Sequence, residues 1–161
     1  MMPFHPTSIL FVCLGNVCRS PLAEGIMRHK VREAGMDDRF MLDSCGTGAW
    51  HVGNPPDHRS ISVGEAHGVD LADLQARKIR LDDFYAFDLI LAMDRSNLGD
   101  LRAMQPRDGT ADVVLYLDYC GLGQQLGFNE VPDPYYGGVG GFEDVFKMVS
   151  QASDILLQKH R

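Results

Sequence analysis

The chain has 161 residues, of which 45% are hydrophobic and 23% are charged, a balance typical of a folded globular protein rather than a disordered or fibrous one. Its 15 basic and 22 acidic residues give a formal net charge of -7. Nucleic acids and anionic membrane surfaces both attract a basic face, so this composition argues against either as a partner. We expect one domain over residues 1–161, because two domains would each be undersized.

Neither a membrane span nor a signal peptide is expected. No stretch reaches the ~18 apolar residues of a spanning helix, and the apolar run at 9–14 is shorter than a typical signal-peptide core. We therefore expect a cytoplasmic location. The cysteines form no CxxC pair, which argues against a zinc ribbon or a thioredoxin-type motif. They are Cys13, Cys18, Cys45 and Cys120.

Short apolar runs alternate with helical patterns along the chain. Strands are predicted at 8–13, 40–42, 87–93 and 113–115, the first of them buried on both faces. Helices are predicted from Ser20 to Gly35, at 57–67, from 94 to before Pro106, and from Phe142 onward after a long glycine-rich connection. The alternation predicts an α/β parallel sheet, which binds ligands at the carboxyl ends of its strands.

The break after the first predicted strand carries the residues that indicate chemistry. Cys13 ends the strand, and Arg19 follows six residues later, immediately before a helix. Backbone N–H groups at a helix N-terminus have no helical partner, so a loop there can enclose an anion. Gly15 and Asn16 tolerate the left-handed backbone that a tight loop needs. Arg19 offers a planar fork that matches two phosphate oxygens.

Cys13 is the candidate nucleophile of this loop. A helix N-terminus and a nearby cation favour the thiolate, to which Ser20 can donate a hydrogen bond. The alternative, a small core residue at a strand end, accounts for Cys13 but leaves Arg19 in a dry loop. Attack on a phosphate monoester also needs a proton for the leaving oxygen. The candidate acid is Asp133, between two prolines after the last strand, although Pro-Asp-Pro is also an ordinary surface turn.

Together these residues resemble the low molecular weight protein tyrosine phosphatase family. The similarity covers 9–157 and rests on the segments 13–21, 53–57, 93–97 and 133–136. It implies a three-layer flavodoxin-like fold, with a four-stranded parallel sheet and helices on both faces. It implies Cys13 as a nucleophile that forms a phosphocysteine, Arg19 as the phosphoryl binder, and Asp133 as general acid and then base. The resemblance implies no metal or cofactor.

The resemblance also implies two groups of residues around this centre. Those at the mouth and in the loop would bind substrate: Leu14, Gly15, Asn16, Val17, Cys18, Trp50, Tyr135 and Tyr136. Those behind the loop would support it, with ordinary caps and surface positions as the alternative: Ser20, Glu24, Ser44 and Asp94.

Two positions, Leu74 and Cys18, leave questions open. Many family members carry a histidine where this chain has Leu74, so a hydrogen bond that supports Asn16 is expected to be absent or replaced. In the family, the position of Cys18 can form a reversible disulfide with the nucleophile. A buried loop cysteine without a redox role is the alternative here.

The combination predicts a protein-tyrosine phosphatase acting on a tyrosine-phosphorylated protein, with a cognate tyrosine kinase as a further expected partner. Aromatic walls favour a flat substrate ring, and a deep slot excludes the shorter phosphoserine. The alternatives are a thiol-dependent arsenate reductase and a phosphatase for another phosphate such as phosphoarginine. Related proteins of both kinds tend to carry a hydroxyl residue where this chain has Val17. A non-catalytic phosphotyrosine-binding module would be expected to lack Cys13 or Asp133.

Overall fold

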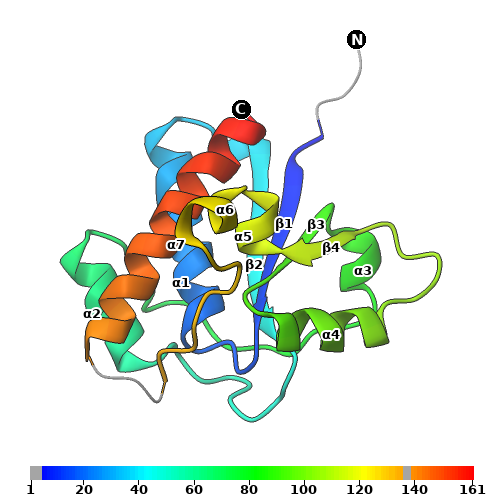
Figure 1. Ribbon diagram of the computed structural model, residues 1–161, viewed down its shortest axis with the longest axis horizontal. Helices are drawn as coiled ribbons and strands as arrows, with labels where there is room; N and C mark the ends of the chain where they lie inside the picture. Colours follow the sequence, from blue (N-terminus) through cyan, green and yellow to red (C-terminus); the bar gives the residue numbers. More distant parts are fainter. Residues whose placement is uncertain (1–4, 136–138) are drawn as a thin grey trace.

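The computed structural model describes residues 5–135 and 139–161. Its strands form one parallel sheet in the order β2-β1-β3-β4 (Figure 1). The strands are β1 (Thr7–Cys13), β2 (Phe40–Gly46), β3 (Leu89–Ala92) and β4 (Asp112–Leu115). The helices are α1 (Arg19–Glu33), the 3₁₀ turn η1 (Asp37–Arg39), α2 (His58–Ala66), α3 (Asp83–Ala86), α4 (Arg95–Met104), α5 (Tyr116–Tyr119), α6 (Leu122–Leu126) and α7 (Val139–Lys159).

The central strand β1 is buried on both faces because helices cover both sides of the sheet. Ile9 and Phe11 point into the larger core, which lies under α1, α7, α5 and α6. Leu10 and Val12 point the other way, into a smaller core under α3 and α4. This alternation is the period-2 geometry of a strand. The predicted three-layer flavodoxin-like fold is confirmed.

The crossover pattern places the end of β1 at a crevice. From β1 the chain passes through α1 to β2 on one side, whereas β3 pairs with β1 on the other side. Loops that leave neighbouring strands in opposite directions open a gap at the carboxyl edge of a parallel sheet. Cys13 is the last residue of β1 and therefore lies at this edge of the sheet.

Some predicted elements differ from the observed ones. The second strand runs to Gly46, four residues beyond its apolar start, because its polar residues have partners inside the fold. The prediction of a long glycine-rich connection before the last helix is wrong, because α5 and α6 form within it. The last helix, α7, begins at Val139, three residues before its predicted start at Phe142. The short α3 also had no prediction. Helices of one turn carry no periodic apolar pattern by which they could be recognised.

Two further points concern the segments that frame the sheet. Gly35, predicted to end α1, has a φ of 68° just beyond that helix, a backbone geometry that glycine adopts without strain. Within the residues that the structure describes, no helix is both long enough and apolar enough to span a membrane.

Candidate active site

The loop after β1 aims backbone and hydroxyl groups at the sulfur of Cys13. Asn16 has a φ of 57°, and this left-handed turn points its backbone N–H at Cys13 Sγ, 3.3 Å away. The hydroxyl of Ser20, in the first turn of α1, lies 3.0 Å from the same sulfur. Both groups are placed to donate a hydrogen bond to a thiolate at this position.

The side chain of Asn16 is a buried hub of the loop rather than a surface contact. Its Nδ2 donates to Ser20 Oγ at 2.7 Å and to Ser44 Oγ at 3.0 Å. Its Oδ1 accepts from the backbone N of Arg77 at 2.9 Å. The support expected from a histidine at the position of Leu74 is therefore replaced by a backbone donor three residues further along the chain.

Arg77 is itself fixed by two carboxylates. Its guanidinium makes hydrogen bonds with both carboxylate oxygens of Asp83, at 3.0 and 3.1 Å, and an ion pair with Asp43. Burial disfavours the charge on Arg77, but its hydrogen bonds to Asp83 and the surrounding negative charges, Asp43 among them, together outweigh that effect and raise its pKa. This anchored arginine holds the backbone N–H that orients Asn16.

Glu24 closes the network on the other side of Asn16. Ser44 donates to Glu24 Oε1 at 2.7 Å, and Arg28 donates to Oε2 at 2.6 Å. Glu24 is nearly fully buried, and this burial raises its pKa above the ordinary value, although the hydrogen bond from Ser44 and the charge of Arg28 oppose the shift.

The raised pKa of Glu24 gives stability a pH dependence of known sign. In a window above pH 4.5, the folded protein keeps a proton that the unfolded chain has released. The free energy of unfolding should therefore fall more with rising pH in the wild type than in Glu24→Gln. Urea unfolding from about pH 4 to about pH 8 measures this difference, in which the other carboxyl groups cancel. A difference that grows in favour of the wild type as pH rises would contradict the expectation.

The side chain of Arg19, the first residue of α1, reaches the start of α4 and the loop that precedes α7. Its Nη1 donates to Asp94 at 2.6 Å and to the carbonyl of Val131 at 2.9 Å. Burial disfavours its charge, but the charge of Cys13 and the hydrogen bond to Asp94 prevail and raise its pKa. Asp94 also caps α4 by accepting from Asn97 N, so the cap and the support of Arg19 are one and the same carboxylate.

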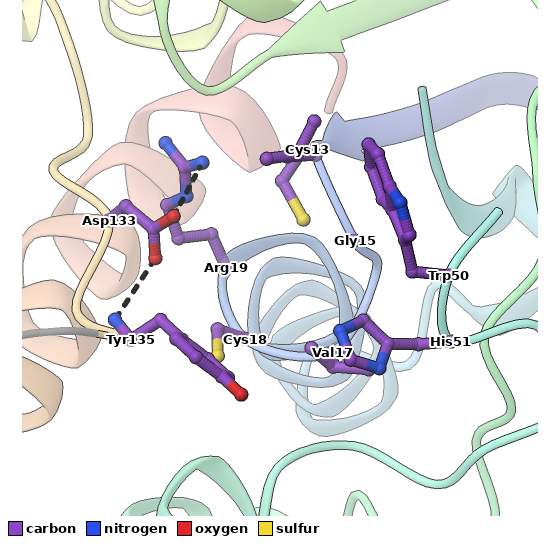
Figure 2. Close-up of a pocket in the computed structure, with 10 residues that line it drawn as sticks. Cys13, Gly15, Val17, Cys18, Arg19, Trp50, His51, Asp133 and Tyr135 are labelled. Carbon is purple, nitrogen blue, oxygen red and sulfur yellow. Dashed lines mark hydrogen bonds and ion pairs between the residues drawn. The ribbon is translucent and has the colours of Figure 1, made fainter. Parts of the chain in front are cut away.

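Asp133 faces this arginine from the loop that precedes α7. Its Oδ2 lies 3.7 Å from Arg19 Nη2, and its Oδ1 accepts from the backbone N of Tyr135 at 3.0 Å. Val131 ties the loop to the sheet, since its N–H donates to the carbonyl of Met93 at 2.8 Å. Figure 2 shows Asp133 and Tyr135 on one side of the cavity, with the Cys13 sulfur pointing into it.

These groups surround a cavity of about 440 Å³. Trp50 and His51 form the wall opposite Asp133 (Figure 2), and Trp50 is 72% exposed. A side chain at Gly48 would overlap the Trp50 ring, so the absence of a side chain there makes room for this ring. Most residues predicted to bind substrate line the cavity: Leu14, Gly15, Val17, Cys18, Trp50 and Tyr135.

Two of the predicted substrate-binding residues do not join the described lining. Asn16 is 2% exposed and turns into the protein. Tyr136 lies outside the described residues. Among the side chains that the structure does describe, no group of three or more His, Cys, Asp and Glu residues could hold a metal ion.

A family model described as low molecular weight phosphotyrosine protein phosphatase matches residues 8–161. The chain belongs to this family. A low molecular weight phosphotyrosine protein phosphatase of Schizosaccharomyces pombe is 48% identical over 139 residues, which are 86% of this chain and 86% of that one.

Solved structures agree with this family. A protein tyrosine phosphatase from Entamoeba histolytica superposes with a TM-score of 0.87 at 36% identity, covering 95% of this chain and 96% of that chain. A Drosophila arginine phosphatase superposes with a TM-score of 0.86 at 34% identity, covering 95% of this chain and 97% of that chain.

Sequence reasoning missed Gly46 and His51 as parts of this phosphatase-family site. A Cβ on Gly46 would lie 2.6 Å from the Leu14 carbonyl, so the end of β2 must be a glycine for the loop at 13–19, the candidate phosphate loop, to pack there. His51 lines the cavity and lies 3.0 Å from where a Cβ on Gly15 would stand. A glycine at a strand end and a histidine beside the only tryptophan were the available signals.

Cys18 lies in the same loop as a buried thiol. Burial, followed by the nearby charges of Asp57 and Cys13, raises its pKa to about 12, which keeps it protonated at neutral pH. Cys13 and Cys18 are both free cysteines in the structure. The two interpretations of Cys18, a reversible disulfide with Cys13 and a buried cysteine without a redox role, both stay open.

Proposed function

We propose that this chain is a protein-tyrosine phosphatase that hydrolyses phosphotyrosine monoesters through a phosphocysteine intermediate. Cys13 is the nucleophile, Arg19 binds the phosphoryl group, and Asp133 is the general acid and base. The observation that carries the proposal is that these three side chains open onto one cavity (Figure 2). The sulfur of Cys13 also accepts a hydrogen bond from the backbone N–H of Asn16.

In the first step, the Cys13 thiolate attacks phosphorus while the phosphate lies in the loop. A P–S bond forms and the bond to the tyrosine oxygen breaks, and Asp133 gives its proton to that oxygen. The negative charge on the other phosphate oxygens is stabilised by Arg19 and by the N–H groups of the loop. The pair of Arg19 with Asp94 and Val131 fixes the guanidinium before substrate binds.

In the second step, a water molecule attacks the phosphocysteine. Asp133, now ionised, takes a proton from this water as the P–O bond forms and the P–S bond breaks. Inorganic phosphate leaves, and Cys13 returns to the thiolate that Ser20 and the N–H of Asn16 support. The cycle consumes one water for each ester hydrolysed and needs no external oxidant or reductant.

The walls of the cavity favour an aromatic ester. Trp50 and Tyr135 face the site from opposite sides, and a flat ring between them buries apolar area. Tyrosine-phosphorylated proteins are the substrates that fit this slot, and a tyrosine kinase must supply them. The nucleophile must also stay reduced, which a cytoplasmic location provides.

Hydrolysis of p-nitrophenyl phosphate in the presence of EDTA tests the proposal. We expect metal-independent turnover by the freshly reduced protein, with a loss of about 10²–10⁴-fold in Asp133→Ala, because the leaving oxygen then lacks its acid. Asp38→Ala, an exposed carboxylate on η1, is the matched control and should keep full activity. The measurement is the rate of p-nitrophenyl phosphate hydrolysis by the wild type, Asp133→Ala and Asp38→Ala.

This experiment and three companion assays separate the proposal from its alternatives. Absence of turnover in the reduced wild type would overturn the phosphatase assignment. Thiol-dependent reduction of arsenate would then indicate the reductase, and preferential release of phosphate from phosphoarginine would indicate the other phosphatase. Binding of a phosphotyrosine peptide without hydrolysis would indicate a recognition module.

A further inference from the structure

Arg59, in the first turn of α2, joins the phosphate loop to the loop that carries Asp133. Its guanidinium makes two hydrogen bonds with Asp57, from Nε to Oδ1 and from Nη2 to Oδ2, both at 3.0 Å. Asp57 caps α2, and its backbone N donates to the carbonyl of Val17 at 2.7 Å. Asp57 therefore fixes the position of the Arg59 guanidinium relative to the phosphate loop.

The same guanidinium packs against two aromatic rings. Its central carbon lies 5.4 Å from the ring centroid of Tyr135 and 4.6 Å from that of Phe142. Phe142 is buried in α7, whereas Tyr135 lines the catalytic cavity. Cation–π contacts of this length are attractive, and the paired carboxylate fixes the direction from which the cation approaches. Arg59 comes from α2 and Phe142 from α7, two helices that pack side by side (Figure 1), so Arg59 joins the Tyr135 ring to this pair of helices.

Tyr135 passes this constraint to the general acid. Its backbone N donates to Asp133 Oδ1 at 3.0 Å, while the other carboxylate oxygen of Asp133 faces Arg19 at 3.7 Å. A shift of the Tyr135 backbone would move the N–H that holds Asp133 Oδ1 and would therefore reorient the carboxyl group of Asp133. Such a rotation would affect catalysis, because proton transfer in the transition state requires the carboxyl group to reach the leaving oxygen at hydrogen-bond distance.

We propose that Arg59 is a positioning residue for the general acid: by bridging Asp57 and the Tyr135 ring, it sets where Asp133 stands relative to the phosphate loop. The inference rests on the proposed function and deepens it. Arg59 matters most for esters of weakly acidic alcohols such as tyrosine, whose oxygen must be protonated as it leaves. It matters little for esters whose leaving group departs as a stable anion.

The test compares kcat/KM for two esters on each protein preparation. Phenyl phosphate releases a phenol about as weakly acidic as tyrosine, and 2,4-dinitrophenyl phosphate releases a stable anion. We expect Arg59→Gln to lower kcat/KM for phenyl phosphate about tenfold more than for the dinitrophenyl ester, a part of the effect of a positioned acid. The ratio of the two values cancels the fraction of folded enzyme, so a general loss of stability does not imitate this result.

Two further variants sharpen the comparison. Arg59→Lys keeps the charge but lacks the planar fork, so we expect its ratio to move in the same direction. Arg32→Gln removes an exposed arginine of α1 that pairs at 3.9 Å with Asp37, and its ratio should equal that of the wild type.

A double-mutant cycle with Asp133→Ala identifies the group through which Arg59 acts. In that background, Arg59→Gln should no longer change the ratio of the two esters. Equal loss for both esters in Arg59→Gln, an unchanged ratio in Arg59→Lys, or a full ratio effect without Asp133 would each overturn the inference. An unchanged ratio in Asp133→Ala alone would instead overturn the proposed role of Asp133, so the two failures are distinguishable.

Discussion

Cys13→Ser is expected to lower hydrolysis of p-nitrophenyl phosphate by at least about 10⁴-fold, because loss of a covalent nucleophile removes the reaction path. A serine hydroxyl at this position stays protonated near neutral pH and does not form the thiophosphate intermediate. The fold should persist, since the replacement is nearly isosteric and its hydroxyl can keep the contact with Ser20. Steady-state rates, with circular dichroism as a check of the fold, measure both parts.

Cys120→Ser is the matched control for this experiment. Cys120 is also buried, and its sulfur donates to the carbonyl of Ala152 at 3.3 Å, far from the cavity lining. A serine there can make the same hydrogen bond, so activity should stay within about twofold of the wild type, as for a substitution remote from the chemistry. Substantial turnover by Cys13→Ser would show that another group attacks phosphorus.

The second large effect is expected for Arg19→Lys. Lysine keeps the positive charge but loses the fork that contacts Asp94 and Val131 through one nitrogen and faces the cavity with the other. Loss of one preorganised donor to a developing oxyanion costs about 10²–10³-fold in kcat. We expect a fall of that order in kcat/KM for p-nitrophenyl phosphate, measured under the conditions used for the wild type.

Arg102→Lys serves as its control, because Arg102 is exposed in the last turn of α4 and lies outside the cavity lining. This conservative change should leave both kinetic constants unaltered. If Arg19→Lys retained wild-type kcat/KM, a point charge would suffice at this position, and the planar geometry of the guanidinium would not contribute to catalysis.

The parts of the site that could be predicted from sequence are those contained in one short segment. Cys13, the left-handed Asn16 and Arg19 belong to a single strand–loop–helix unit, so their spacing alone brings them together. Parallel-sheet topology then indicates which edge of the sheet they occupy. Asp133 could be named because it lies in a loop at that same edge.

The resemblance named the supporting side chains Ser20, Glu24, Ser44 and Asp94, but the support that a backbone group provides could not be predicted. The donor that replaces a histidine near Asn16 is the backbone N–H of Arg77, which every residue type except proline carries. The second strand was underestimated for a related reason. Ser44 breaks its apolar pattern, yet this hydroxyl is satisfied by Glu24 from a helix 20 residues away in sequence.

The packing of Trp50 on Gly48 has a spectroscopic consequence. Trp50 is the only tryptophan of the chain and is 72% exposed at the mouth of the cavity, so indole emission comes from one place. A ligand that fills the slot shields this indole from water and alters its emission, which makes titration of unlabelled protein practicable. Denaturation changes the surroundings of an indole that is already mostly in water, so unfolding of the sheet is better followed by far-ultraviolet circular dichroism.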